Sequence, residues 1–291
     1  MSSSSLQGYL LAILGVFLLS PDSLLIRFIG DDAWLISVWR GLLGGLMILL
    51  YNRWLVDRRP IREQLAPARY WLLGMIALTA TSQLGFVYAI THANVTDVLV
   101  ILAFAPLMSA FMSALFLHEK VDLRTWIATL VCALGLAVLF LQNDSNSQVI
   151  GLLAAIICAV TMAGQFVIMR GCPEANFTAC VGVGNIVGGL VSILLAGSIW
   201  PEDSQWLPLL IMCLVVLPVP YMLFIVSLRT ITAAETSLIM LLESILGSLW
   251  VWAVFAEEPT LQTVMAGLLI VGTLTIYGVL VMRDPGIKES T

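Results

Sequence analysis

Ten long apolar runs dominate this sequence, and each is long enough to cross a lipid bilayer as a helix. A membrane-spanning helix needs about 20 predominantly apolar residues, because the hydrocarbon layer is about 30 Å thick. Backbone amides in that layer must be hydrogen-bonded within the chain, which helical runs achieve. The sequence therefore predicts an all-α integral membrane protein with ten transmembrane helices. The runs cover residues 6–28, 33–54, 70–91, 95–117, 123–141, 149–169, 178–199, 206–227, 233–255 and 262–282.

Short connections between the runs leave no room for a separate soluble domain. The longest connection covers only residues 55–69. Charged residues make up 11% of the 291 residues, whereas soluble domains carry about 25%. We therefore expect most of the chain to be embedded in the lipid bilayer. We do not expect it to bind nucleic acid.

Basic residues alternate between the two sides of the predicted membrane. Lys and Arg in short loops are retained in the cytoplasm, so their positions report the direction of each span. Eleven of the thirteen basic residues lie at the ends of the even-numbered runs or just beyond them. This alternation predicts a multi-pass protein of the inner membrane with both termini in the cytoplasm. The eleven are Arg53, Arg58, Arg59, Arg62, Arg69, Lys120, Arg124, Arg170, Arg229, Arg283 and Lys288.

An internal repeat divides the chain into residues 1–145 and 146–291. Each half contains five runs, an odd number, so the second copy must enter the membrane inverted. Inverted repeats are characteristic of secondary transporters, and small residues four apart allow close helix packing in lipid. When Gly8 is aligned with Gly151, the other matched positions include Arg27 with Arg170, Gly41 with Gly184, and Gly45 with Gly188.

Each half carries a series of short motifs in a similar order. The first series is Ala89-Ile-Thr-His-Ala-Asn-Val-Thr-Asp97, Ala105-Pro106 and Leu117-His-Glu119, and the second is Ser227-Leu-Arg, Ala233-Ala-Glu235, Glu243-Ser244 and Glu257. The second span adds Trp39-Arg40-Gly41. In these features the sequence resembles the EamA-type branch of the drug/metabolite transporter superfamily along essentially its whole length. Ser244 departs from the proline usual after this glutamate, and Ser20-Pro21-Asp22-Ser23 departs from the family's Trp-Gly pattern. The resemblance implies a central cavity between the halves and export of amino acids, drugs or related metabolites.

Asp22 and Arg40 are ionisable side chains inside apolar runs at comparable predicted depth. At about 1.5 Å of rise per residue, Asp22 lies roughly 24 Å from the inner end of its span, and Arg40 roughly 10 Å from the outer end of the next. Intramembrane charges usually pair or face a cavity, so we predict an ion pair. Either this pair is static and joins two helices, or Asp22 binds a proton or cation and Arg40 anchors a substrate carboxylate.

Glu243 is the strongest single candidate for a transport role. It lies roughly 15 Å into the ninth span, near the midplane, at about 1.5 Å per residue. No Lys or Arg shares this span. A low dielectric favours the neutral carboxyl, so Glu243 either exchanges protons as the cavity opens and closes or stays protonated and bonded to backbone.

Other polar residues in the spans have weaker patterns. Asn94-x-x-Asp97 and Thr232-x-x-Glu235 are typical of helix-capping boxes, so capping is favoured over transport for Asp97 and Glu235. Side chains that either bind substrate or join helices are Gln165, which occupies the repeat position of Asp22, together with Gln83, Tyr88 and Asn185. Aromatic anchors at the membrane surfaces are predicted at Trp34, Trp54, Trp71, Trp126, Trp200 and Trp206.

The combined pattern predicts a secondary transporter that exports small metabolites by alternating access, coupled to protons through Glu243 or Asp22. An uptake permease of the same fold and a non-transporting membrane scaffold are the alternatives, and a homodimer is left open. An enzyme is not expected, because the sequence has no HExxH motif, its two histidines fall at opposite membrane faces, and no span carries paired carboxylates. Primary active transport is disfavoured because no GxxxxGK[ST] phosphate loop is present. No cofactor or metal site is expected, since the cysteines lie within or beside apolar runs without metal-ligand spacing.

Overall fold

The computed structural model describes residues 3–30, 32–66, 69–116, 126–128, 130–132, 134–135, 146–171, 177–227, 233–256, 258 and 260–283. Every regular element within these residues is a helix. The first half contributes α1 (Ser3–Leu19), α2 (Asp22–Ile29), α3 (Ala33–Trp39), η1 (Arg40–Gly44), α4 (Gly45–Tyr51), η2 (Asn52–Val56), α5 (Ile61–Leu65), α6 (Leu72–His92), α7 (Val95–Ala103) and α8 (Ala105–Phe116). The second half contributes α10 (Asn146–Gly171), α11 (Phe177–Leu195), α12 (Trp206–Ile211), η4 (Met212–Val216), α13 (Pro218–Ser227), α14 (Ala233–Phe255) and α15 (Leu261–Arg283).

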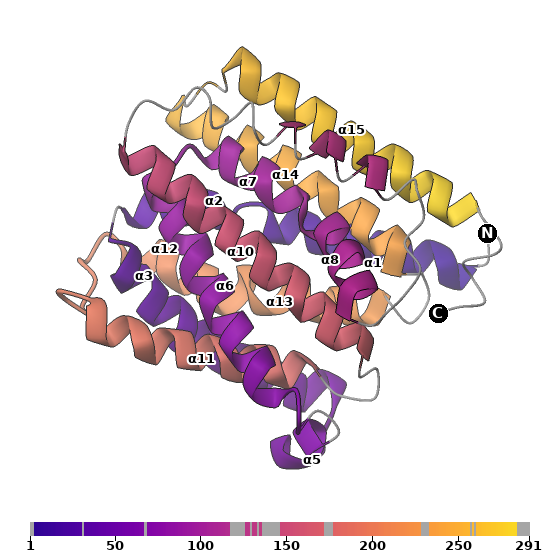
Figure 1. Cartoon of the computed structure of the whole chain (residues 1–291). Coiled ribbons are helices and arrows are strands. Elements are labelled where there is room, and N and C mark those ends of the chain that lie inside the picture. Colours follow the sequence, from indigo (N-terminus) through magenta and orange to yellow (C-terminus); the bar gives the residue numbers. More distant parts are fainter. Residues whose placement is uncertain are drawn as a thin grey trace.

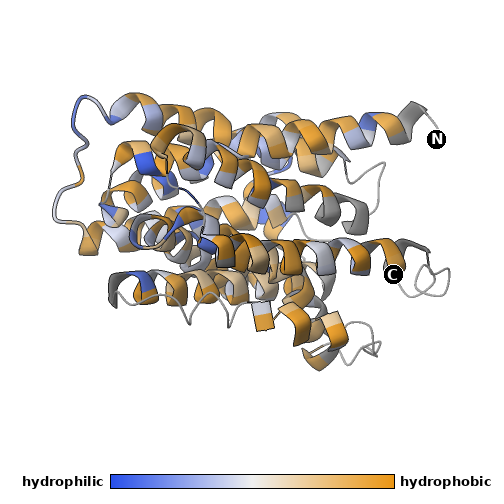
Figure 2. Ribbon diagram, turned by 90° about the horizontal axis from the view of Figure 1, so that it is seen from above, coloured by the Kyte–Doolittle hydropathy of each residue, from blue (hydrophilic) through white to orange (hydrophobic). Residues whose placement is uncertain are grey.

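The predicted spans that fall on described residues are helical. Six helical segments are long and apolar enough to cross a membrane, and shorter apolar helices cover 95–109, 242–255 and 263–277. The fifth predicted span, 123–141, lies mostly outside the described residues, as do the basic residues Lys120, Arg124, Arg229 and Lys288. The helices form one bundle, in which the start of α1 and the end of α15 lie at the same end (Figures 1 and 2).

The outside of the bundle is apolar, as lipid contact requires. Figure 2 shows hydrophobic residues along most of the helices. Leu73 on α6, Leu194 on α11 and Leu268 on α15 are 80%, 84% and 71% exposed. The interior, in contrast, holds polar side chains such as Asp22 and Gln83. Polar groups buried inside a membrane bundle face other helices or a cavity, so they indicate where a site lies.

Small residues bring the second span into direct backbone contact with α11. A Cβ atom added to Gly41 would lie 2.5 Å from the Gly189 backbone and 2.6 Å from the Asn185 carbonyl oxygen. One at Gly45 would lie 2.8 Å from the Gly182 carbonyl oxygen. The predicted close approach at these glycines is therefore present, and it joins an element of the first half to one of the second.

Replacing Gly41 by Ala is expected to destabilise this packing by about 1–3 kcal/mol, because the added methyl meets backbone atoms that have no room to rotate away. The measurement is the thermal unfolding midpoint of the purified protein in detergent. Gly272→Ala on α15 is the matched control, since a Cβ there has no described atom within 4 Å. If both variants unfold at the wild-type temperature, the contact between the second span and α11 is looser than described.

Among the described residues, three of the predicted spans are interrupted by a turn. The first span breaks at Ser20-Pro21, so α1 ends at Leu19 and α2 begins at Asp22. In the fourth, a turn at Phe104 separates α7 from α8. In the eighth, a turn at Leu217 separates η4 from α13. Interrupted helices at the midplane are common in transporters, where the freed backbone lines a cavity.

Candidate functional site

A buried ion pair joins the first two spans. Arg40 Nη1 donates to Asp22 Oδ1 over 2.5 Å, and the two side chains are 11% and 4% exposed. The Phe86 ring of α6 lies under the guanidinium, with its centroid 4.9 Å from Arg40 Cζ. The predicted ion pair is therefore confirmed. The ion pair with Asp22 and the cation–π contact with Phe86 together fix the position of the Arg40 guanidinium.

Two π-helical segments face each other beside this ion pair. Arg40 is the first residue of η1 and Met212 the first of η4, and Arg40 Nη1 lies 3.8 Å from Met212 Sδ. The two segments are also joined by a hydrogen bond, in which the Cys213 thiol donates to the Trp39 carbonyl oxygen over 3.4 Å. A π-helical turn shifts the backbone hydrogen bonds from i→i−4 to i→i−5. Such segments are frequent at functional sites because they re-aim side chains within a continuous helix.

The second half contributes Glu243 and Tyr221 to the same region. Glu243 is half-buried on α14, and both Asp22 and Arg40 act electrostatically on its carboxyl group. Tyr221 on α13, whose side chain is 38% exposed, lies within electrostatic range of Arg40, Glu243 and Asp22. Gly247 of α14 packs against α7 and α2: a Cβ there would lie 2.7 Å from Leu99 Cδ1, closer than packing allows, and 3.4 Å from Ser23 Oγ, an ordinary contact distance. The cluster Asp22, Arg40, Tyr221 and Glu243 thus combines residues of both halves.

Comparison with known proteins assigns the whole chain to a family of membrane transporters. The EamA-like transporter family matches residues 6–141 and again residues 149–279. The chain belongs to the EamA-like transporter family. An uncharacterized transporter of Archaeoglobus fulgidus is 22% identical over 265 residues, which cover 91% of this chain and 93% of that protein. A solved crystal structure shares the fold, with a TM-score of 0.63, 20% identity, and coverage of 97% of this chain and 99% of its own.

These likenesses fix the broad class of this EamA-like protein. It is a multi-pass membrane transporter, and family and relative both point away from an enzyme. The apolar helices that form its surface agree with a location in the membrane.

The charged cluster of this EamA-like protein has uncharged counterparts in the repeat alignment. The register that aligns Gly8 with Gly151 also places Asp22 on Gln165 and Arg40 on Val183. In the later spans, the register that aligns Asp97 with Glu235 places Glu243 on Ala105. In this alignment each charged position is charged in only one half of the chain: Asp22 and Arg40 in the first half, and Glu243 in the second.

Gln165 and Gln83 lie at contacts between helices. Gln165 Oε1 accepts a hydrogen bond from Thr79 Oγ1 over 3.1 Å, which joins α10 to α6. Gln83 Nε2 donates to the Ser37 carbonyl oxygen over 2.9 Å, one turn before Arg40. Gln83 Oε1 is buried and has no partner within the described residues. The Gln83 oxygen packs against Gly188 of α11, where an added Cβ would clash with it, so both glutamines lie in contacts between helices.

Tyr88 and Asn185 are placed away from the charged cluster. Tyr88 stacks on His92 with ring centroids 3.9 Å apart, and the Trp34 ring lies 5.9 Å from it. This aromatic group lies toward the end of α6 that precedes α7. Asn185 faces Gly41 and Gly45 at the contact between the second span and α11. The structure does not bring these two predicted candidates together with Glu243.

Of the two predicted capping residues, Asp97 and Glu235, the structure describes the side chain of Asp97 only. Asn94 caps α7, because its Oδ1 accepts from the Thr96 amide over 2.9 Å. Asp97 lies in the first turn of α7, but its Oδ1 accepts a hydrogen bond from Thr263 Oγ1 of α15 over 2.7 Å. Asp97 thus links α7 to α15 in addition to its place at a helix start. Glu235 lies in the first turn of α14, and its side chain is outside the described residues.

Tyr221 and Phe86 are members of the site that the sequence reasoning did not single out. The repeat register that aligns Asp97 with Glu235 also aligns Gln83 with Tyr221. Phe86 follows Gln83 by three positions and therefore shares its helix face. Extending the repeat alignment to the third and eighth spans would have found Tyr221. Phe86 carries no polar signal, so only its helical spacing from Gln83 pointed to it.

Proposed function

We propose that this protein exports small metabolites, amino acids or related compounds foremost, across the inner membrane by alternating access. The observation that carries the proposal is the cluster of Asp22, Arg40, Tyr221 and Glu243, which draws its members from both halves of the chain. Coupling sites in transporters with inverted repeats lie near the midplane at the interface of the repeats. The two separate family matches and the common end of α1 and α15 support the inverted ten-span arrangement with cytoplasmic termini.

Charge balance within the cluster indicates how a solute would be bound. Arg40 is already paired with Asp22, which leaves Glu243 as the acidic group without a hydrogen-bonded cation among the described residues. A proton or the ammonium group of an amino acid can neutralise it. Since both would occupy the same carboxylate, binding of one releases the other, and the transport mode is exchange. A proton gradient directed into the cell then drives the solute outward.

Buried polar atoms of α2 and α6 provide further contacts for a solute. Ser23 Oγ and Gln83 Oε1 are buried without a hydrogen-bond partner in the part of the chain that the structure describes. A buried polar atom without a partner costs about 1–3 kcal/mol, and a bound solute with matching groups would remove that cost. Phe86 and Tyr221 add aromatic surface beside a cationic group.

Proteoliposomes test this function directly. Vesicles that contain the purified protein are loaded with a radiolabelled amino acid, and efflux is measured with and without an acidic exterior. We expect efflux to rise with the inward proton gradient and to lose this dependence when a protonophore is added. Screening amino acids and amines for resistance in overexpressing cells selects the solutes. Gradient-driven accumulation with the opposite sign would assign an uptake permease, and the absence of flux for every resistance hit would overturn the proposal.

A further inference from the structure

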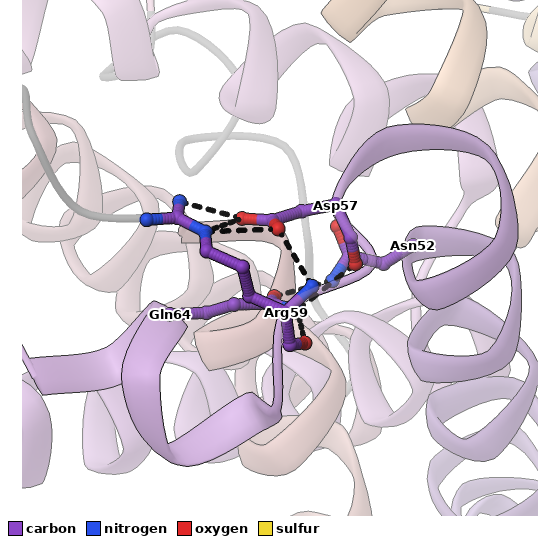
Figure 3. Close-up of polar contacts among 4 residues, drawn as sticks. All are labelled: Asn52, Asp57, Arg59 and Gln64. Atoms are coloured by element: carbon purple, nitrogen blue, oxygen red, sulfur yellow. Dashed lines mark hydrogen bonds and ion pairs between the residues drawn. The ribbon is translucent and has the colours of Figure 1, made fainter.

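The cytoplasmic end of the second span is folded into a compact polar platform. Figure 3 shows its four members, Asn52, Asp57, Arg59 and Gln64. Asn52 Nδ2 donates to Gln64 Oε1 over 2.7 Å, and Gln64 Nε2 donates to the Arg59 carbonyl oxygen over 2.6 Å. Asn52 and Gln64 are 0% and 1% exposed. The connection between the second and third spans is therefore tied back onto the helix that precedes it.

The arginines of this segment differ in whether their charge is neutralised by an ion pair. Arg59 Nη2 donates to Asp57 Oδ2 over 2.7 Å and Arg59 Nε donates to Asp57 Oδ1 over 3.1 Å, so this guanidinium is neutralised by a two-pronged contact. Arg53 and Arg58 are exposed and form no ion pair with any residue that the structure describes. Two positive charges without an ion-pair partner among the described residues therefore lie on the segment that the platform orders.

These two arginines line an open hollow together with two apolar side chains. The hollow has a volume of about 570 Å³ and is lined by Arg53, Trp54, Leu55 and Arg58. Trp54 and Leu55 are each 70% exposed. Such exposure is unfavourable in water, whereas Trp prefers the headgroup layer of a membrane and Leu its hydrocarbon. The hollow therefore lies at the level where a lipid headgroup meets its acyl chains.

We propose that this hollow binds an anionic phospholipid of the cytoplasmic leaflet, with the phosphate between Arg53 and Arg58 and the acyl chains along Trp54 and Leu55. Guanidinium groups bind phosphate oxygens in a two-pronged geometry, and basic hollows at the cytoplasmic end of a span suit anionic headgroups. The polar platform already orders the segment, so lipid binding costs little conformational entropy. The leaflet follows from the proposed topology, but the site itself is independent of the proposed substrate.

Native mass spectrometry of the purified full-length protein tests this site. Phosphatidylglycerol and phosphatidylcholine are titrated separately into the detergent-solubilised protein, and bound lipids are counted. Arg53→Gln/Arg58→Gln is expected to weaken phosphatidylglycerol binding about thirtyfold, the combined effect of two guanidinium groups at a membrane surface. Phosphatidylcholine binding should change little. Arg62→Gln is the matched control, because Arg62 is an exposed arginine of the same segment that does not line the hollow.

Two results would overturn the proposal. If Arg62→Gln weakens phosphatidylglycerol binding as much as the double variant does, the effect belongs to the general positive charge of this surface. If inorganic phosphate displaces the lipid at equal concentration, the hollow is a site for free anions and the apolar residues have no part in it. Both arginines are exposed, so the variants are expected to keep the wild-type unfolding temperature, which serves as the check on folding.

Discussion

Replacing Glu243 by Gln is expected to lower solute flux by about tenfold to a hundredfold, the loss that accompanies removal of a charged hydrogen-bond partner. The amide keeps the size of the side chain but replaces one acceptor oxygen by a donor NH2 group and cannot take up or release a proton. In the proposed exchange, proton and solute occupy the same carboxylate. Any residual efflux by the variant should therefore no longer respond to an inward proton gradient. The measurement is efflux of the labelled solute from proteoliposomes at equal protein density, with and without the gradient.

Glu258→Gln provides the matched control for this substitution. Glu258 is exposed in the connection that follows α14, so the same chemical change there leaves the cluster untouched. We expect wild-type flux and wild-type proton dependence from this variant. Glu243→Asp, which keeps the acid but shortens the side chain, should retain part of the proton dependence. Unchanged flux and unchanged proton response in Glu243→Gln would contradict a coupling role and favour a structural glutamate.

The apolar runs made most of the helical architecture predictable. Run length and charge alternation are local properties that the bilayer imposes, so helices such as α6 and α11 lie close to their predicted ranges. The pairing of Asp22 with Arg40 was also predictable, because antiparallel neighbouring spans bring residues of equal depth together. The positions at which the helices are interrupted were harder to predict from the sequence. The π-helical register of η1 and η4 depends on packing between distant spans, and apolar composition alone does not encode it.

The assembly of the site needed the three-dimensional structure. Depth placed Glu243 near the midplane, but depth does not say which helix face α14 turns toward α2. Gly247 of α14 packs closely against Leu99 of α7, and a glycine in a membrane helix has many uses, so its presence in the sequence did not reveal this contact. For Asp97, too, the sequence predicted the local role of the residue but not its long-range contact. Its place at a helix start was visible in the sequence, whereas its hydrogen bond to Thr263 spans 166 residues.

Asp22→Ala is expected to destabilise the protein by about 3–5 kcal/mol, because it leaves the Arg40 guanidinium charged and buried without its partner. The side chains of the pair are only 4% and 11% exposed, so water cannot replace the lost carboxylate without opening the packing. Arg40→Met with Asp22→Leu removes both charges and fills the space with apolar atoms. Such replacements of buried pairs are often neutral or stabilising, so we expect the double variant to unfold close to the wild-type temperature.

The double variant also separates the two roles left open for this pair. If Asp22→Leu/Arg40→Met recovers stability and still transports, the pair only joins two helices, and Glu243 acts without it. Recovery of stability without transport places the pair in the mechanism, because the double variant takes away the two charges that lie within electrostatic range of the Glu243 carboxyl group. The second result is expected, since both Asp22 and Arg40 act electrostatically on the Glu243 carboxyl group. Unfolding midpoints and proteoliposome flux, measured on the same preparations of single and double variants, give the coupling between the two residues.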